Sequence, residues 1–105
     1  MNDSEDYYDE YRRLIWWLFF ATRGGEMRKK IIQFLSANPS NIYQISTGLK
    51  VNYRTVEHHV KILEENHIIS SVGEKYGKTF FVSSTFRDKF PIIEEYEMKM
   101  KKKYR

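Results

Sequence analysis

The sequence contains no cysteine. Disulfide bonds, zinc ribbons and metal sensing through thiolates are therefore excluded. The absence fits a protein of the cytoplasm, and we expect that location.

Long apolar runs are absent as well. The longest one, Leu14–Ala21, is far shorter than the roughly 20 residues of a membrane-spanning helix. The first residues, Met1–Glu10, are acidic, whereas a signal peptide starts with basic residues. We therefore expect a soluble protein without a membrane partner.

The sequence also has few signs of catalysis or metal binding. It contains no glycine-rich phosphate loop and no recognisable spacing of nucleophile, base and orienting group. His58 and His59 are adjacent, so on a helix their side chains point about 100° apart and cannot easily share a metal ion. We predict that the protein is not an enzyme and has no cofactor and no metal.

Charge is plentiful but unevenly placed. The 105 residues carry a net charge of +4, yet residues 1–11 hold five acids and no base. All 18 bases lie beyond that segment, and lysines crowd the last positions. A basic body favours a polyanionic partner such as nucleic acid, although a lysine-rich end can also simply aid solubility.

Hydrophobic periodicity predicts four helices, a hairpin and a last helix. The fold class is therefore mainly α (α+β), with the hairpin directly after two short helices joined by a tight turn. The predicted helices are Ser4–Ala21, Glu26–Ala37, Asn41–Thr47, Tyr53–Asn66 and one starting near Ser84 or Thr85, and the predicted strands are Ile68–Val72 and Lys78–Val82.

Local signals set the expected helix ends. Gly48 can take the left-handed conformation that ends the third helix, and Asn52 is a good N-cap for the fourth. Pro91 fits the first turn of the regular part of the last helix.

The segment from Asn52 to Ile69 resembles the recognition helix and first wing strand of ArsR-like and MarR-like winged helix-turn-helix regulators, especially archaeal ones. Its Thr-Val-x-x-His-Val-x-x-Leu pattern at residues 55–63 carries the resemblance, and Met27–Leu35 and Ile42–Ile45 are similar to the earlier helices of these proteins. The resemblance covers residues 23–83 and implies a DNA-binding transcription regulator. Metal-sensing members have a cysteine pair that is missing here, so that activity is not carried over. These regulators often have a glycine at the position of His67, so the resemblance implies a left-handed backbone there at the end of the fourth helix, which histidine tolerates better than most residues with a side chain.

The predicted recognition helix has two faces. Val56, Val60 and Leu63 point inward, and the opposite flank carries groups that suit a major groove. Arg54 is the candidate for a base contact, preferentially to guanine. Tyr53, Thr55 and Lys61 suit phosphates, and Glu57 suits cytosine or the exclusion of wrong bases. The full set of predicted DNA-binding residues, wing included, is Asn52, Tyr53, Arg54, Thr55, Glu57, His58, Lys61, Lys75, Tyr76 and Lys78.

Basic residues outside this set are expected to add phosphate contacts. The candidates are Arg28, Lys29, Lys30 and the C-terminal lysines. They matter because residues 50–82 hold nearly as many acids as bases, so a lone domain should bind weakly. Alternatives stay open: the outward flank could be an ordinary solvated face, and the wing tip could only protect a sheet edge.

The aromatic first helix predicts dimerisation together with the last helix. Twofold dimers are common among regulators of this type and space two recognition helices by roughly 34–36 Å. The same rings could instead be intramolecular core, and insertion into a membrane surface is disfavoured by the acidic start. The predicted interface residues are Tyr11, Leu14, Ile15, Trp16, Trp17, Leu18, Phe19, Phe20, Phe90, Ile93, Tyr96 and Met100.

The sequence thus predicts one winged helix-turn-helix domain over residues 1–105. Its parts are an aromatic helix (1–22), the winged-helix core (23–83) and a C-terminal helix with a basic tail (84–105). The expected partners are double-stranded DNA and a second copy of the chain, and the expected role is repression by occlusion of a palindromic site. The alternative is a winged-helix module for protein interaction or for architectural, sequence-independent nucleic-acid binding.

Overall fold

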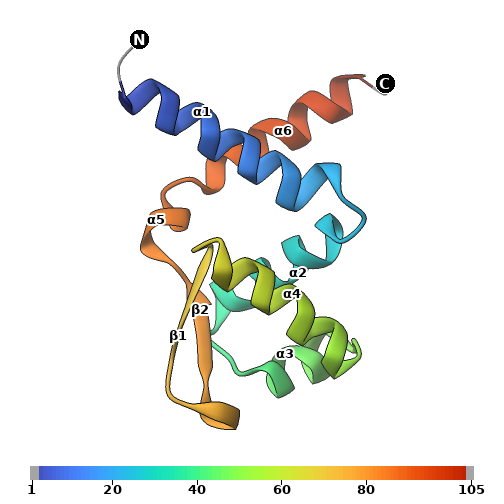
Figure 1. Ribbon diagram of the computed structural model, residues 1–105. Helices are drawn as coiled ribbons and strands as arrows, with labels where there is room; N and C mark the ends of the chain where they lie inside the picture. Colours follow the sequence, from blue (N-terminus) through green and yellow to red (C-terminus); the bar gives the residue numbers. More distant parts are fainter. Residues whose placement is uncertain (1–2, 104–105) are drawn as a thin grey trace.

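The computed structural model describes residues 3–103, and the side chains of residues 9–102. The chain forms helices around one core, with a two-stranded hairpin at one side (Figure 1). In order, the elements are α1 (Asp3–Trp16), the π-helix η1 (Trp17–Ala21), α2 (Gly25–Ala37), α3 (Ile42–Leu49), α4 (Tyr53–Glu65), β1 (Ile69–Val72), the 3₁₀ turn η2 (Lys75–Gly77), β2 (Thr79–Val82), α5 (Ser84–Arg87) and α6 (Phe90–Lys103).

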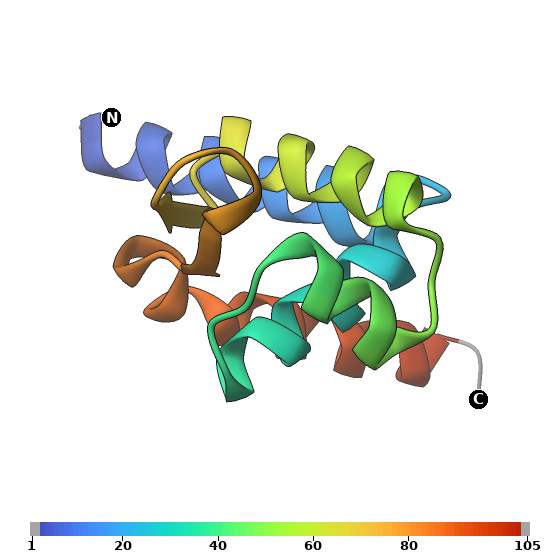
Figure 2. The same ribbon diagram turned by 90° about the horizontal axis from the view of Figure 1, so that it is seen from below.

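The elements at the two ends of the molecule differ. Helices α1 and α6 cross at one end, whereas α3, the start of α4 and the tip of the hairpin lie at the other (Figure 1). Seen from below, these last three elements face the viewer together (Figure 2). The fold therefore separates the aromatic helix from the predicted recognition helix.

The hairpin pairs β1 and β2 in antiparallel register, from Ile69 opposite Val82 to Val72 opposite Thr79. Ser40, just before α3, adds a short bridge because its N–H and C=O both bond to Phe80, at 3.1 and 2.8 Å. This bridge fixes the hairpin against the helix-turn-helix unit.

The core is mainly aliphatic, and its buried side chains come from α1, η1, the hairpin and each of the helices α2 to α6. Aliphatic residues such as Ile31, Ile45 and Leu63 have no exposed surface. The rings of Phe19 and Phe86 stack inside it with centroids 5.8 Å apart. Burial of such side chains is worth roughly 1.5–3 kcal/mol each, which makes this core the main source of stability.

Helices α1 and α6 are joined by a forked ion pair. Both terminal nitrogens of Arg12 donate to Glu95, at 2.9 and 3.1 Å. Hydrogen bonds from Arg12 and Lys99 lower the pKa of Glu95 to about 2. The ion pair therefore joins the first helix of the chain to the last one.

The predicted elements are confirmed, with three differences. The first helix ends in a π-helical turn rather than a regular α-helix. Gly48 does not end α3, because the helix continues to Leu49 and Lys50 takes the left-handed conformation (φ 56°). The last helix is divided into α5 and α6, with Pro91 in the first turn of α6 as predicted. No helix of the described part of the chain is long and apolar enough to cross a membrane.

Candidate nucleic-acid interface

Two capped helices and a tight turn build the helix-turn-helix unit. Asn41 caps α3 through a reciprocal capping box with Gln44, at 2.8 and 2.9 Å. Lys50 reverses the chain, and the Asn52 side chain then accepts from the N–H of Arg54 at 2.8 Å. These caps satisfy backbone groups that the helix ends would otherwise leave without partners, so both helices start at fixed positions.

Helix α4 has the two faces that the sequence predicted. Val56, Val60 and Leu63 are buried, with at most 2% of their surface exposed. The opposite flank is solvent-exposed, and neither the protomer's core nor the wing covers it. Its exposed residues are Tyr53, Arg54, Thr55, Glu57, His58 and Lys61.

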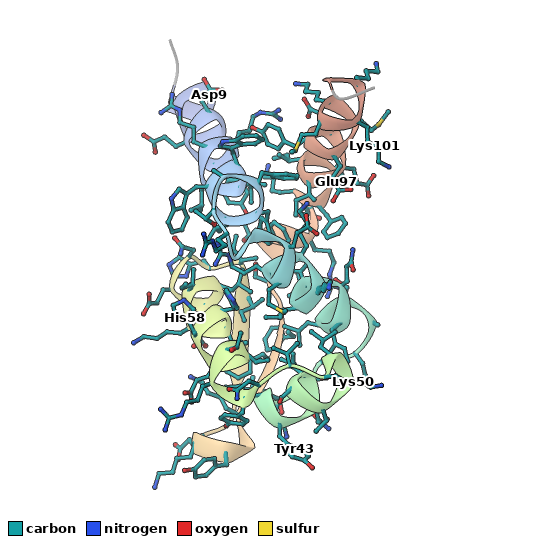
Figure 3. All side chains as sticks on the ribbon, turned by 90° about the vertical axis from the view of Figure 1, so that its right-hand side faces the viewer. Asp9, Tyr43, Lys50, His58, Glu97 and Lys101 are labelled. Atoms are coloured by element: carbon teal, nitrogen blue, oxygen red, sulfur yellow. The ribbon has the colours of Figure 1, made fainter. Side chains whose placement is uncertain are left out.

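Tyr43 extends this surface, although the sequence analysis did not include it. It is 67% exposed on α3, and Figure 3 shows it with Lys50 at the same end of the molecule. Ile42 and Ile45 mark the inward side of α3, so an outward tyrosine between them was a signal that could have identified it. A phenolic hydroxyl here can donate to a phosphate.

The wing contributes two exposed residues and one paired residue. Tyr76 is 89% exposed at the tip, and Lys75 beside it is also exposed. Lys78 is half-buried, with its Nζ 3.4 Å from Glu64 Oε1 and 5.6 Å from the centre of the Phe80 ring. The structure therefore presents Lys75 and Tyr76 to a partner, whereas Lys78 is partly neutralised by Glu64.

An open groove runs between α4 and the wing. Its walls come from α3, α4, the hairpin tip and β2, and they mix tyrosines with lysines and two glutamates. The lining residues are Ile42, Tyr43, Tyr53, Glu57, Val60, Lys61, Glu64, Lys75, Tyr76, Lys78 and Phe80.

Two of the three basic residues at the start of α2 do not fit the expected phosphate-binding role. Arg28 is only 3% exposed, so the prediction that it contacts phosphate is wrong. The Nζ of Lys29 lies 3.0 Å from Glu26 and 3.6 Å from Glu97, so its charge is locally compensated. Lys30 alone of the three is exposed.

Arg28 instead forms a buried link to α4. Its Nε donates to the Leu18 carbonyl at 2.7 Å, and its Nη1 lies 3.1 Å from Nδ1 of His59. Burial lowers the pKa of Arg28. The pKa of His59 is lowered first by burial, then by the charges of Arg28 and His58. The expected part-buried, hydrogen-bonded His59 is confirmed, and so is the exposed position of His58.

At the opposite end, the predicted dimer residues fall into two groups. Ile15, Leu18, Phe19 and Ile93 are buried inside the protomer and so belong to its own core rather than to an exposed contact surface. The others lie at the surface or are half-buried. The exposed members are Trp16, Trp17 and Met100, and the half-buried ones are Tyr11, Leu14, Phe20, Phe90 and Tyr96.

Solved structures of winged-helix proteins share this arrangement of helices and hairpin. Reduced HlyU from Vibrio cholerae superposes with a TM-score of 0.64 at 18% identity, over 90% of this chain and 95% of that chain. Staphylococcus aureus MarR, in complex with salicylate and kanamycin, gives 0.65 at 16%, over 94% and 69%. Streptococcus pneumoniae FabT, in complex with DNA, gives 0.57 at 16%, over 96% and 78%.

The sequence comparison points to one family within this class. Residues 25–71 match the profile described as "Bacterial regulatory protein, arsR family". This stretch runs from the start of α2 through the helix-turn-helix into β1. No curated protein matches the sequence. The helix-turn-helix part of the chain is thus similar to the arsR family, in agreement with the resemblance seen in the sequence, and the fold of the chain is a winged helix.

Proposed function

We propose that the protein binds a palindromic duplex as a homodimer and represses transcription by occluding the site. The observation that carries this proposal is the exposed polar flank of α4, held outward by the buried Val56–Val60–Leu63 ridge. A helix with such a flank fits the roughly 12 Å wide major groove. The role places the protein in the cytoplasm, where it meets DNA.

Each exposed side chain has a proposed part. Arg54 lies in the first turn of α4, where recognition helices contact base edges, and it reads guanine. Asn52, Tyr53, Thr55 and Lys61 contact the phosphate backbone around it. Glu57 and His58 lie further along the same flank and restrict which bases are accepted.

The wing contacts the neighbouring backbone or minor groove. Cations are favoured in a narrow minor groove, and Lys75 with Tyr76 forms the exposed tip. Lys78 adds less because Glu64 lies beside it.

Arg54→Ala tests the direct reading of sequence. DNA fragments selected by the parent protein provide the site, and binding to this site and to a scrambled duplex is measured by fluorescence anisotropy. We expect the variant to lose about 1–3 kcal/mol on the selected site and little on the scrambled one. Arg87→Ala, an exposed arginine on α5, is the matched control and should keep the preference.

Equal losses on both duplexes would mean that Arg54 only neutralises phosphate. An unchanged preference would place sequence reading elsewhere on the surface.

A protein-interaction module is the second candidate. It is favoured by the modest basic charge of the interface, where Lys78 is paired with Glu64 and Glu57 lies among the outward residues. Salt separates the two functions, because DNA binding releases counterions and weakens steeply as salt rises. Absence of duplex binding even at low salt would favour the module.

A further inference from the structure

A buried arginine joins the aromatic first helix to the recognition helix. The guanidinium of Arg28 reaches back to η1, where it donates to the Leu18 carbonyl at 2.7 Å and to the hydroxyl of Thr22. On its other side it contacts His59 of α4 at 3.1 Å. One side chain of α2 therefore bridges the helix end that carries Trp17 and the helix that carries the DNA-binding flank.

The π-helical turn takes part in this bridge. Leu18, whose carbonyl accepts from Arg28, lies within η1, and the Thr22 hydroxyl bonds back to the Trp17 carbonyl at 3.1 Å. π-Helical turns are rare and are often found at functional sites. Here the turn and Thr22 together present two oxygen acceptors to a buried cation.

Space around the contact is restricted by Gly24. A Cβ atom built on this glycine would lie 2.6 Å from Nη1 of Arg28 and 2.6 Å from Cε1 of His59. The loop before α2 thus comes close enough to enclose the pair, and the absence of a side chain at position 24 leaves room for it.

The chemistry of the pair dictates one protonation state. Among the described residues, no carboxylate forms an ion pair or hydrogen bond with Arg28. Arginine has only donors, so Nδ1 of His59 has to be the acceptor. His59 is therefore neutral in this arrangement, with its proton on Nε2.

We propose that Arg28 and His59 are positioning residues for DNA binding, which hold α4 in its binding orientation only while His59 is neutral. This inference rests on the proposed function. A proton on Nδ1 would turn the acceptor of this hydrogen bond into a second donor. It would also place two positive charges 3.1 Å apart, away from solvent. The contact would break, and α4 would lose its tie to η1.

The surroundings of His59 oppose that proton at neutral pH. The charged or titratable groups that face it are Arg28 from α2 and His58 on its own helix, whose ring centroid is 5.2 Å away. The neighbouring η1 and loop contribute the Thr22 hydroxyl and Gly24, which are uncharged. Burial and the charges of Arg28 and His58 lower the pKa of His59, so the switch operates at a more acidic pH than the ordinary titration of histidine.

The test measures duplex affinity against pH. The selected duplex is titrated by fluorescence anisotropy at constant ionic strength between about pH 5 and pH 8, the range in which histidines change charge. We expect the affinity of the parent protein to be constant near neutrality and to fall by about tenfold or more, or 1.4 kcal/mol per tenfold step, at the acidic end.

Two asparagine variants separate the neighbouring histidines. His59→Asn keeps an oxygen acceptor near the position of Nδ1 but does not titrate, so its affinity, relative to its own value at neutral pH, should not fall in acid. His58→Asn removes the exposed titratable group and should keep the acidic fall relative to its own affinity at neutral pH, whatever its effect on that affinity. An acidic fall that survives in His59→Asn, or that disappears in His58→Asn, overturns the proposal.

A measurement on the parent protein guards against a variant that does not fold. Histidine NMR should show the Nε2–H tautomer for His59, and its titration midpoint should agree within about one pH unit with the loss of affinity. A different tautomer or a distant midpoint also overturns the proposal. Absence of duplex binding at every pH would overturn the proposed function and this inference with it, whereas pH-independent binding would overturn the inference alone.

Discussion

Among residues 3–103, three non-glycine residues adopt a left-handed backbone, and two of them end helices. Lys50 (φ 56°) follows α3 and His67 (φ 60°) follows α4, while the third, Lys75, lies in the wing. A side chain in this region costs roughly 1–2 kcal/mol, a cost that glycine avoids. The sequence provides a glycine near the end of α3, at Gly48, yet uses it inside the helix.

Contacts of the third helix explain why Gly48 is not the cap. A Cβ atom at this position would lie 2.3 Å from Cε2 of Phe34, so the glycine allows the close packing of α3 on α2. Glycine often ends helices, but here it is needed inside the helix, where the Phe34 ring, 14 positions earlier in the chain, leaves no room for a Cβ atom. Such a distant contact is not visible in local sequence.

Lys50→Gly should therefore stabilise the protein. Removal of the left-handed strain raises the free energy of unfolding by about 1 kcal/mol, which thermal unfolding detects as a rise of a few degrees in Tm. The matched control is Lys30→Gly, which removes an exposed lysine from the interior of α2 and should lower the stability by about 1 kcal/mol. A destabilised Lys50→Gly would show that the lysine side chain contributes contacts that outweigh the strain.

Arg28 is a basic residue whose burial the sequence did not predict. Three basic residues in a row suggest a phosphate-binding patch, and only Lys30 remains exposed. Helical geometry places successive residues about 100° apart, so one of the three had to turn inward. The inward position of Arg28 depends on the Leu18 carbonyl, which accepts its hydrogen bond. This carbonyl lies in the π-helical turn η1, which hydrophobic periodicity does not predict.

Among the elements, the wing depends on a turn whose two glycines have different roles. Gly73 has a φ of +92°, and a Cβ there would lie 2.7 Å from the Gly77 carbonyl oxygen. At Gly77 a Cβ would meet nothing within 4 Å. The effect of a glycine-to-alanine substitution can therefore be compared between Gly73 and Gly77, at the two ends of the same loop.

Gly73→Ala should distort the wing tip, whereas Gly77→Ala should be tolerated. The first adds backbone strain of about 1–3 kcal/mol and displaces Lys75 and Tyr76, so we expect a lower Tm and weaker duplex binding. Both are measured on the same two variants by thermal unfolding and fluorescence anisotropy. Normal DNA affinity in a destabilised Gly73→Ala would remove the wing from the proposed interface.

Most elements could be predicted from the sequence because their apolar spacing is regular. The α4 ridge of Val56, Val60 and Leu63 set the orientation of the whole recognition helix, and Asn52 set its start. The division of the last helix was less predictable. Ser83 caps α5 by accepting from the Phe86 N–H at 3.2 Å, and its hydroxyl also donates to the His67 carbonyl at 2.9 Å, a tertiary contact that the sequence does not reveal.

At the scale of the whole molecule, the end opposite the candidate nucleic-acid interface leaves large apolar side chains uncovered. Trp16, Trp17, Met98 and Met100 are between 37% and 63% exposed on η1, α6 and the end of α1. Figure 3 shows charged residues such as Asp9 and Lys101 around the same end. Exposed apolar patches with a polar rim are typical of protein–protein contacts, which is why we propose that a second copy of the chain binds at this end.

The charge distribution also favours a second copy here. The acids of residues 1–11 belong to α1, and the lysines at the end of the chain belong to α6. Both elements lie at this end of the protomer (Figure 1). A twofold axis would allow the acidic segment of one copy to approach the basic segment of the other, and an isologous interface makes every such contact twice.

Trp17→Gln tests whether this end carries the dimer. Trp17 is half-exposed, so the substitution removes contact surface with little damage to the protomer's core. Sedimentation analysis should give twice the 12.8 kDa chain mass for the parent and a shift toward the single chain for the variant. Tyr43→Gln is the control, because it removes an exposed ring from the DNA-binding end and should leave the mass unchanged.

Duplex binding then links the oligomeric state to recognition. A dimer holds two recognition helices at a fixed spacing of roughly 34–36 Å, so a palindrome gains affinity over a half-site only when both copies are joined. Trp17→Gln should lose that gain while its affinity for a half-site stays close to the parent value. A parent protein that sediments as a single chain and binds both duplexes equally would show instead that the aromatic end has another partner, and each α4 would then read its groove alone.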